Sequence, residues 1–430
     1  MTDFPPRHVR VARGPAAVRH GRLPRRRAAL SALRLLSGVI AVALVSTAFV
    51  SAYAVWDVSR SVKKGVQLVA LPGHTAAPQD VPDVGAIDGG VNLLLVGTDS
   101  RSGLGGVYDN AAEQDASSGQ GNNDVTMLLH IAQDHKSMMV VSFPRDLMVS
   151  MPECPALKGG GTVRSSSSAM FNTALSRGGL PCVVLTVEKL TGVQIPFAAT
   201  VNFNGVSAMS NAVGGVAVCL ATPVSDAYTN PPLHLPAGEN TLVGDQALSF
   251  LRSRHGVGDG SDLGRISNQQ VFLSALARKI VSGGVLSNPV QLYALAKAVV
   301  ANVTPSQTLT NPTTLVQIAL ALKDTGLENM VFLQYPTVSD PDNANRVVPQ
   351  SSAAKVVNQA LVQDHSVKLT GTTGRAAEEP NATPTPTPAV TESATEPPAM
   401  STPTGGGSVE LPSNVTGQTA AQQTCTKGNN

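Results

Sequence analysis

The stretch "DVTMLLHIAQDHKSMMVVSFPRD", residues 124–146, contains two apolar runs separated by the polar, turn-like segment "QDHK". Short apolar runs bounded by turn residues are typical of buried strands, and so short a connection joins neighbouring antiparallel strands. The run "VNLLLVG" at residues 91–97 predicts a further buried strand upstream. Three strands at the start of the folded body are therefore expected to form a sheet.

Helical patterns alternate with further strands along the rest of the body. Helices are predicted at residues 168–179, 181–192, 204–215, 243–254, 263–280, 288–303 and 311–326, and strands at 197–203 and 328–335. Asn204 is the expected cap of the third helix. This order predicts an α/β fold, an α-β-α three-layer domain with a mixed central sheet and helices on both faces, preceded by one transmembrane helix.

The N-terminal region differs in charge from the rest of the chain. The first 34 residues hold 9 of the 31 Lys and Arg and 1 of the 29 Asp and Glu, which leaves 22 basic and 28 acidic residues for the remainder. The uncharged residues 35–56 would span about 33 Å as a helix, enough for a bilayer core of about 30 Å. The preceding arginines predict a cytoplasmic N-terminus and an extracellular body. The alternatives are a cleaved signal peptide, which usually has a shorter apolar region, and a basic nucleic-acid-binding arm.

Composition divides the chain into five segments. They are a cytoplasmic basic tail (1–34), a transmembrane anchor (35–56), a juxtamembrane linker (57–90), an extracytoplasmic folded domain (91–369) and a Pro/Thr-rich tail (370–430). The tail has few apolar anchors, so disorder is expected there, either as a tether through the cell wall or as an inert spacer.

Four cysteines suit an exported domain, because disulfides persist in oxidising compartments. Cys154 and Cys182 lie in loop-like contexts and are a candidate pair, although three complete pairings are open. Cys219 lies in the apolar run "GVAVCL" and is expected to be a buried thiol. The sequence assigns no role to Cys425.

Three charged residues stand at the ends of the first three predicted strands. Asp99 follows the first strand, Asp124 precedes the second, and Arg145 follows the third. If neighbouring strands pair antiparallel, these positions meet at one edge of the sheet. Two carboxylates repel each other unless a cation lies between them, and Mg²⁺ or Mn²⁺ completed by phosphate oxygens fits this pattern. The alternative is that each aspartate only caps a turn.

The segment "LRSRHGVGDGSDLGRISNQQ", residues 251–270, concentrates positive charge in a charge-poor chain. Its polar side chains include Arg252, Arg254, Asp262, Arg265 and Gln269. The last two are four residues apart on one helix face, which continues into apolar residues. A guanidinium group can bind two phosphate oxygens at once. A face that runs from arginine to apolar side chains therefore suits a pyrophosphate attached to a lipid. The alternative is a solvated network of Arg/Asp ion pairs.

Five motifs occur in the order found in the LytR-CpsA-Psr family of bacterial cell-envelope proteins. They are "VNLLLVGTDSR", "NNDVTMLLHI", "MVVSFPRD", "LPAGENTLVGDQALSFLRSRH" and "GDGSDLGRISNQQ". The chain resembles this family over residues 91–281. The resemblance implies transfer of a phosphorylated glycopolymer from a polyprenyl diphosphate carrier to peptidoglycan, outside the membrane, with Mg²⁺-assisted formation of a phosphodiester. The composition and the candidate Cys154–Cys182 pair look actinobacterial, which hints at arabinogalactan or a related polysaccharide.

The resemblance also implies roles for individual residues. Asp99 and Asp124 match metal-binding aspartates, and the residues that match pyrophosphate-binding positions are Arg145, Arg252, Arg254, Arg265 and Gln269. The catalytic residues that the resemblance implies are Asp262, Arg145 and Arg265. Asp262 would either activate the acceptor hydroxyl or support the site, and the sequence does not rank it above Asp99 as the general base. Three asparagines depart from the pattern of many members, which carry arginine before the second aspartate and before the Gln pair. They are Asn122, Asn123 and Asn268, and fewer cations there could weaken pyrophosphate binding or alter the donor.

Two other functions remain open at this point. A polyprenyl diphosphate phosphohydrolase would use the same arginines with water as the acceptor. A non-catalytic wall-binding or scaffolding protein is a different class, and the substituted arginines favour it. A nucleic-acid partner is disfavoured, because the body is acidic, is expected outside the membrane and has no recognisable DNA-binding motif.

Overall fold

A computed structural model describes residues 25–71, 90–100, 120–157, 160–380 and 408–429. The chain divides into two compact units, residues 1–57 and 58–430. Helix α1 (Arg25–Ser61) contains the predicted span, and its segment Ala29–Ser61 is long and apolar enough to cross a membrane. Most of the basic tail, residues 1–24, lies outside the described residues.

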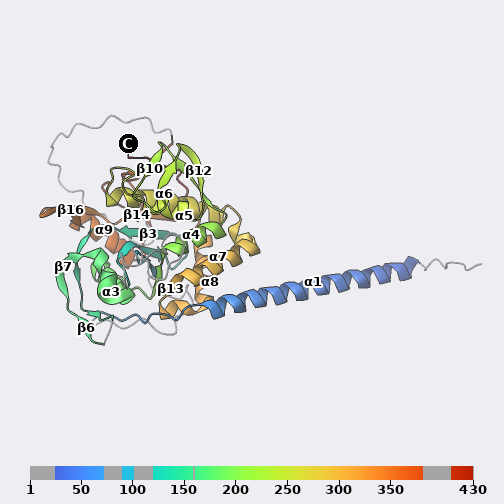
Figure 1. Ribbon diagram of the computed structural model, residues 1–430. Coiled ribbons are helices and arrows are strands. Elements are labelled where there is room, and N and C mark those ends of the chain that lie inside the picture. Colours follow the sequence, from blue (N-terminus) through green and yellow to red (C-terminus); the bar gives the residue numbers. More distant parts are fainter. Residues whose placement is uncertain (1–24, 72–89, 101–119, 158–159, 381–407, 430) are drawn as a thin grey trace, which may run out of the picture. The chain divides into compact units, whose positions relative to one another are not determined.

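The second unit is built on a seven-stranded sheet (Figure 1). Its strands, in spatial order, are β13 (Val303–Pro305), β8 (Phe197–Val201), β1 (Val91–Thr98), β2 (Asn123–Ile131), β3 (Met138–Phe143), β14 (Met330–Gln334) and β20 (Gly417–Thr419). The predicted hairpin is confirmed, because β2 pairs antiparallel with β3, and β1 pairs antiparallel with β2. The sheet is mixed, since β8 is parallel to β1 and β14 is parallel to β3.

The remaining elements surround this sheet. The helices are α3 (Ala174–Thr191), α4 (Phe203–Ala212), α5 (Asp245–Arg252), α6 (Asp262–Val281), α7 (Pro289–Asn302), α8 (Pro312–Thr325) and α9 (Ser351–Val362), with short 3₁₀ turns at Phe171–Thr173, Val285–Ser287, Gln307–Thr310 and Leu327–Asn329. The short strands are β4 (Met148–Met151), β5 (Cys154–Pro155), β6 (Thr162–Val163), β7 (Ser166–Met170), β9 (Val216–Leu220), β10 (Val224–Asp226), β11 (Leu233–Leu235), β12 (Gly238–Leu242), β15 (Thr337–Asp340), β16 (Asn343–Pro349), β17 (Val367–Lys368), β18 (Ala377–Glu378), β19 (Val409–Glu410) and β21 (Cys425–Thr426).

Helices cover both faces of the sheet. Successive residues of β1 point to opposite faces, and they belong to different apolar clusters. Leu94 shares a buried cluster with Val184 of α3 and Val357 of α9. Leu93 shares another with Ile318 of α8, and residues of α6 pack against that second cluster. The predicted three-layer arrangement is therefore confirmed.

Two local predictions were wrong. Residues 168–170 belong to β7 and not to a helix, and the helical segment that follows is interrupted at Gly178 and Gly179, whose backbone angles are not helical. Asn202, and not Asn204, caps α4, because its side chain accepts a hydrogen bond of 2.9 Å from the Gly205 N–H. The chain turns into the helix two residues earlier than the sequence pattern indicated.

The C-terminal segment, residues 408–429, is part of the fold, and residues 370–380 contain strand β18, so the prediction of disorder beyond residue 369 was wrong in both segments. Strand β20 pairs antiparallel with β14, and β21 lies between β9 and β18 in a four-stranded sheet. These strands are two or three residues long, and they are stable because they pair with distant strands, which leaves little local sequence signal. The Pro/Thr-rich residues 381–407 lie outside the described residues.

Both pairs of cysteines form disulfides. The predicted Cys154–Cys182 bond is present, with a Cα–Cα distance of 5.2 Å. Cys219 is bonded to Cys425, so the expectation of a buried free thiol at Cys219 was wrong. The cause is tertiary, since β21 runs parallel to β9 and brings Cys425 opposite Cys219.

Candidate functional site

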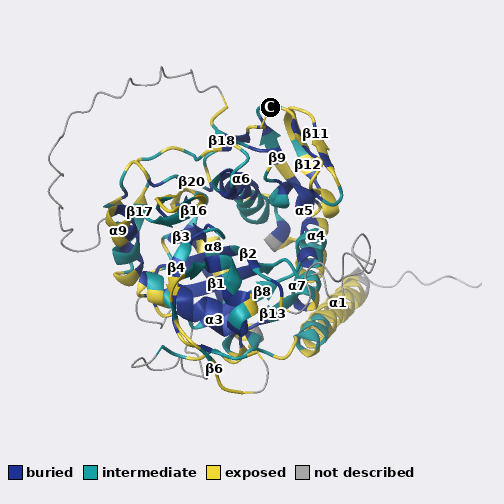
Figure 2. Cartoon of the chain, turned by 60° about the vertical axis from the view of Figure 1, so that its left-hand side comes forward, coloured by how far each residue is buried: buried dark blue, intermediate teal, exposed yellow. Residues whose placement is uncertain are grey.

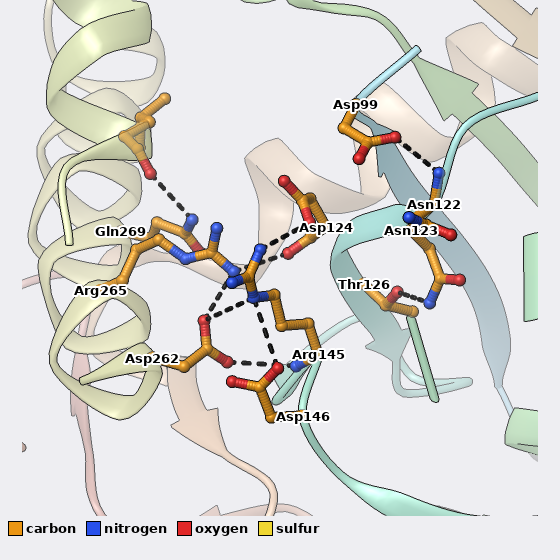
Figure 3. A network of polar contacts seen from close by, with 11 residues as sticks. Asp99, Asn122, Asn123, Asp124, Thr126, Arg145, Asp146, Asp262, Arg265 and Gln269 are labelled. Atoms are coloured by element: carbon orange, nitrogen blue, oxygen red, sulfur yellow. Dashed lines mark hydrogen bonds and ion pairs between the residues drawn. The ribbon is translucent and has the colours of Figure 1, made fainter. Parts of the chain in front are cut away.

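The ends of β1, β2 and β3 meet at one edge of the sheet, as the antiparallel order predicts. Thr98 is paired with Asn123, and Thr126 is paired with Phe143. Asp124 and Arg145 lie directly beside these pairs, and Arg145 Nη1 is 3.0 Å from Asp124 Oδ1 (Figure 3). The predicted contact between the second aspartate and the arginine of the "PRD" motif therefore exists.

Arg145 is surrounded by three carboxylates. Its Nε lies 3.5 Å from Asp146 Oδ1 and 3.9 Å from Asp262 Oδ1, in addition to the contact with Asp124. Burial by itself would lower the pKa of Arg145, but these three carboxylates more than offset burial and raise its pKa. The guanidinium is therefore a fixed positive charge at the sheet edge.

Helix α6 brings Asp262 and Arg265 to the same edge. Ser261 caps the helix through a hydrogen bond to the Gly264 N–H, which places Asp262 in the first turn. Arg265 Nη2 lies 2.6 Å from Asp262 Oδ1 and also donates to the carbonyl of Asp124 at 2.8 Å. Both side chains are nearly inaccessible, at 6% and 5% exposed. Asp262 also accepts a hydrogen bond of 3.1 Å from the backbone N–H of Arg145, and so ties the end of β3 to α6.

Asp146 is the member of this cluster that the sequence analysis did not assign a role. Burial raises its pKa, and the neighbouring charge of Asp262 raises it further, while Arg145, Arg254 and Arg265 act in the opposite direction. Its position next to Arg145 in "PRD" was the available signal. A carboxyl group with a raised pKa among arginines is a candidate proton acceptor.

The other predicted polar residues lie in two different surroundings. The charge of Arg254 acts to lower the pKa of Asp146, so the two side chains lie close together. Gln269 is buried, and its Nε2 donates to the Leu251 carbonyl at 3.0 Å. Arg252 instead lies over the ring of Phe203, 4.3 Å from the ring centre. That contact is a cation–π interaction with α4.

Asp226 supports the segment that carries Arg254, and the sequence analysis missed it. Its Oδ2 accepts hydrogen bonds from the Ser253 hydroxyl and from the backbone N–H groups of Arg254 and Gly256. Burial would raise the pKa of Asp226, but these donors and the Tyr228 N–H lower it. The partners lie 27 to 30 residues away, so no local motif could reveal this role.

Three guanidinium groups of the cluster keep a buried N–H without a hydrogen-bond acceptor. The atoms are the Nε atoms of Arg145, Arg254 and Arg265. Buried donors are normally paired, so unpaired ones at a candidate site indicate a missing acceptor. A phosphate or pyrophosphate group offers acceptors of the kind that arginine binds.

Asp99 lies at the end of β1, next to the segment that leads into β2. Its Oδ1 accepts a hydrogen bond of 2.6 Å from the Asn122 N–H, and the Asp99 N–H donates to the Asn122 carbonyl at 3.2 Å. Gly121 has a positive φ of 69°, and a Cβ there would lie 2.5 Å from Asp99 Oδ1. Glycine at this position therefore allows the backbone to approach the carboxylate.

The two predicted metal ligands have suitable chemistry for a hard cation. Within the described residues, no group of three or more His, Cys, Asp and Glu side chains could hold an ion. Mg²⁺ is commonly held by one or two carboxylates and completed by water and phosphate oxygens. Asp99 and Asp124 lie at the ends of the adjacent strands β1 and β2, and Asp124 already pairs with Arg145 through one oxygen.

Comparison with known proteins identifies the family. The profile of the LytR_cpsA_psr family matches residues 65–362, well over half of the chain. The chain belongs to the LytR-CpsA-Psr family. The match includes every strand and helix that carries the cluster described above.

The names of two similar proteins refer to cell-wall components. The cell wall biosynthesis protein LcpA of Corynebacterium glutamicum is 31% identical over 277 residues, covering 60% of this chain and 52% of that protein. The polyisoprenyl-teichoic acid–peptidoglycan teichoic acid transferase TagV of Bacillus subtilis is 27% identical over 257 residues, covering 59% of this chain and 62% of that protein. The matched part therefore spans about half to two thirds of these relatives.

A solved structure supports the fold assignment. Protein gbs0355 from Streptococcus agalactiae superimposes with a TM-score of 0.50 at 22% identity, covering 64% of this chain and 87% of that structure. At this identity the likeness concerns the fold alone.

The three asparagines that depart from the family pattern have structural roles. Asn268 is fully buried, and it donates to the Phe250 carbonyl at 2.7 Å and accepts from the Thr426 hydroxyl at 2.8 Å. Asn123 is buried as well and accepts from the Leu175 N–H at 3.1 Å. The side chain of Asn122 accepts from the Ser176 hydroxyl at 3.1 Å. In this LytR-CpsA-Psr protein, these positions join secondary-structure elements.

Proposed function

We propose that this LytR-CpsA-Psr protein transfers a glycopolymer phosphate from a polyprenyl diphosphate carrier to a hydroxyl group of peptidoglycan. The observation that carries the proposal is the pair of buried guanidinium Nε atoms on Arg254 and Arg265 that have no hydrogen-bond acceptor. They lie in the same cluster as Arg145, whose Nε makes no hydrogen bond and has carboxylate oxygens only at 3.5 and 3.9 Å. A pyrophosphate would supply those acceptors. The name of the relative TagV, a teichoic acid transferase, supports the same reaction class.

The arginines provide binding and charge neutralisation. Arg145 and Arg265 are held by Asp124 and Asp262, so their positions are set before the substrate arrives. Preorganised positive charge stabilises phosphoryl transfer because negative charge spreads over the phosphoryl oxygens in the transition state. Arg252 lies over the Phe203 ring, and Gln269 donates to the Leu251 carbonyl, so we assign these two residues the role of positioning the motif that binds pyrophosphate.

The transfer needs one proton acceptor and one leaving group. The hydroxyl oxygen of the acceptor forms a bond to the phosphorus next to the glycopolymer, the bond from that phosphorus to the bridging oxygen breaks, and polyprenyl monophosphate leaves. The hydroxyl proton goes to a carboxylate within hydrogen-bond reach. Asp262 is engaged by Arg265 and by the Arg145 N–H, while the pKa of Asp146 is raised. Asp146 is therefore our first candidate for the base, and Asp262 positions the arginines.

Asp99 and Asp124 are the residues that would hold Mg²⁺ or Mn²⁺. When bound, such an ion neutralises charge on the phosphate oxygens. Asp124 would then both bind the ion and hold the Arg145 guanidinium in place.

The setting proposed for this reaction is the outer surface of the cell membrane. Helix α1 would anchor the chain, the arginines that precede it would remain in the cytoplasm, and the second unit would be extracellular. Two disulfides suit an oxidising compartment.

The test uses the full chain in phospholipid nanodiscs with a polyprenyl diphosphate-linked oligosaccharide, Mg²⁺ and peptidoglycan fragments. We expect polyprenyl monophosphate release together with radiolabelled sugar on peptidoglycan, and loss of both with EDTA. Arg254→Ala tests the role of the arginines. It removes the guanidinium but keeps the hydrogen bond from the backbone N–H of residue 254 to Asp226, so the segment should stay in place. Asp146→Asn should lose the transfer while still binding the carrier.

Each result has a defined meaning. Release of polyprenyl monophosphate without sugar on peptidoglycan, at the same rate with and without the acceptor, would make the protein a phosphohydrolase. Carrier binding that needs Arg254 but gives no release would indicate a binding role. Binding and release that are unaffected by Arg254→Ala would contradict the proposed arginine site.

A further inference from the structure

The segment from α7 to α8 is almost free of charge. Between residues 281 and 322 the only charged side chain is Lys297, whereas charged residues make up 14% of the whole chain. Lys323 and Asp324 follow in the last turn of α8. Several apolar side chains in this segment are nevertheless exposed to solvent. They are Val290 (74% exposed), Leu292 (43%), Tyr293 (36%), Val316 (58%) and Leu320 (52%).

On each helix, exposed apolar residues and a lysine follow helical spacing. On α7, Val290, Tyr293 and Lys297 are three and four residues apart and therefore share a face. On α8, Val316 and Leu320 are four residues apart, with Lys323 three residues further. Residues such as Val300 and Ile318 are buried, so each helix also has a side that packs against the body.

The chain that leaves α1 is attached to the connection between these two helices. Val66 forms a β-bridge with Ser306, which lies between the end of α7 and the start of α8. The Val66 N–H donates to the Pro305 carbonyl, and the Gln307 N–H donates to the Val66 carbonyl, each at 2.8 Å. Helix α1 ends at Ser61, and the five intervening steps of chain extend at most about 18 Å.

We propose that the exposed apolar sides of α7 and α8 rest on the outer leaflet of the membrane that α1 crosses. A helix with apolar residues on one side and lysine beside them can lie at a lipid interface, with its apolar side buried about 5–10 Å deep. The lysine is within α7 at Lys297 and in the last turn of α8 at Lys323. Tyrosine is favoured at that depth, and lysine can extend its amine to the lipid phosphates. The short connection from Ser61 to Val66 keeps the segment near the membrane surface.

This inference rests on the anchoring role of α1 in the proposed function, and not on the transfer reaction. Its consequence is that the catalytic unit has a preferred orientation on the membrane. A flexible tether alone would let the unit rotate freely.

The experiment uses the single tryptophan of the chain, Trp56, which is first replaced in the variant Trp56→Phe. Single reporters are then introduced as Val290→Trp or Leu320→Trp in the full chain. The controls are Val338→Trp on β15 and Val362→Trp at the end of α9, where the native valines are 44% and 52% exposed. Each protein is reconstituted into vesicles of phosphatidylglycerol and phosphatidylcholine with or without brominated acyl chains.

Bromine quenches tryptophan fluorescence only at short range, so quenching reports contact with lipid. We expect quenching at residues 290 and 320 to exceed that at residues 338 and 362 by about twofold or more, because interfacial helices bury their apolar side in the acyl boundary. Adding Val316→Glu should reduce quenching of the Leu320→Trp reporter, and adding Val338→Glu should not. Equal thermal unfolding curves establish that the variants are folded.

Two outcomes would overturn the inference. Equal quenching at all four positions in folded variants would mean that α7 and α8 do not touch lipid. Weak quenching at residues 290 and 320, with a fluorescence spectrum that shifts on dilution into more lipid, would assign these sides to contact with a second copy of the chain. Neither readout needs the carrier or peptidoglycan, so failure of the proposed transfer reaction would be seen separately.

Discussion

The hydroxyl of Thr426 donates a hydrogen bond of 2.8 Å to the amide oxygen of Asn268, 158 residues earlier in the chain. The side-chain nitrogen of Asn268 donates to the Phe250 carbonyl on α5. Helix α6, which carries Asn268, is also held by Gln418, whose buried amide donates to the Gln270 carbonyl and to the Ser274 hydroxyl. The C-terminal segment thus contacts α6 at Asn268, Gln270 and Ser274, next to Gln269. Figure 2 shows how much of α6 is buried.

Thr426→Val should lower the free energy of unfolding by about 1–3 kcal/mol, because the buried Asn268 oxygen loses its donor. Urea unfolding followed by circular dichroism measures this change. Thr241→Val is the matched control, since Thr241 is exposed on β12. An equal effect of both substitutions would mean that the Thr426–Asn268 bond contributes no specific stabilisation.

Removal of the two disulfides should have unequal effects. The sequence separation is 206 residues for Cys219–Cys425 and 28 residues for Cys154–Cys182. In the chain-entropy account, the disulfide that closes the longer loop stabilises the fold by about 2 kcal/mol more than the one that closes the shorter loop. The double variants Cys219→Ser/Cys425→Ser and Cys154→Ser/Cys182→Ser are compared by urea unfolding. A larger loss in the second variant would contradict the entropic account for this protein.

Arg254→Ala and Arg265→Ala should separate binding from stability. Arg265 is buried against Asp262, and removing one partner of a buried pair costs about 3–5 kcal/mol. The hydrogen bonds of Arg254 to Asp226 use its backbone N–H, so Arg254→Ala should stay within about 1 kcal/mol of the parent. Its affinity for geranyl diphosphate, measured calorimetrically, should fall at least about tenfold, because a charge-assisted bond is worth about 1.5–3 kcal/mol. Unchanged affinity would place the pyrophosphate elsewhere.

Glu188 should make stability depend on pH. Burial raises the pKa of Glu188 to about 7 from an ordinary value of 4.5, although the Ile195 N–H that donates to it acts in the opposite direction. The folded state binds this proton more tightly, so the stabilisation is complete below pH 4.5 and is lost as the pH rises through about 7.

The matched variant for this effect is Glu188→Gln. The stability difference between the parent and this variant should change by roughly 1–3 kcal/mol between pH 4.5 and pH 8, with the parent losing more. Urea unfolding of both proteins at several pH values measures it. A constant difference across this range would mean that Glu188 titrates normally in the folded protein.

The sequence by itself determined the central hairpin, the long apolar helix and the order of the polar motifs. Period and length identify β2, β3 and most helices, because buried strands and amphipathic helices need those patterns. Antiparallel pairing then brings Asp124 and Arg145 together, since the start of one strand and the end of the next share an edge. The Cys154–Cys182 bond was a candidate among three open pairings, and its cysteines lie on β5 and α3, not in loops.

Only the tertiary structure decided how the arginine cluster is held and what the C-terminal segment does. Asp226 accepts a hydrogen bond from the Arg254 N–H, Asn268 accepts one from Thr426, and a disulfide links Cys219 to Cys425. In each case the partners are far apart in the chain. Short strands such as β20 and β21 have no period to detect, because their stability comes from pairing with strands formed elsewhere. Local patterns specify the elements, whereas burial and long-range hydrogen bonds select which of their polar residues reach the site.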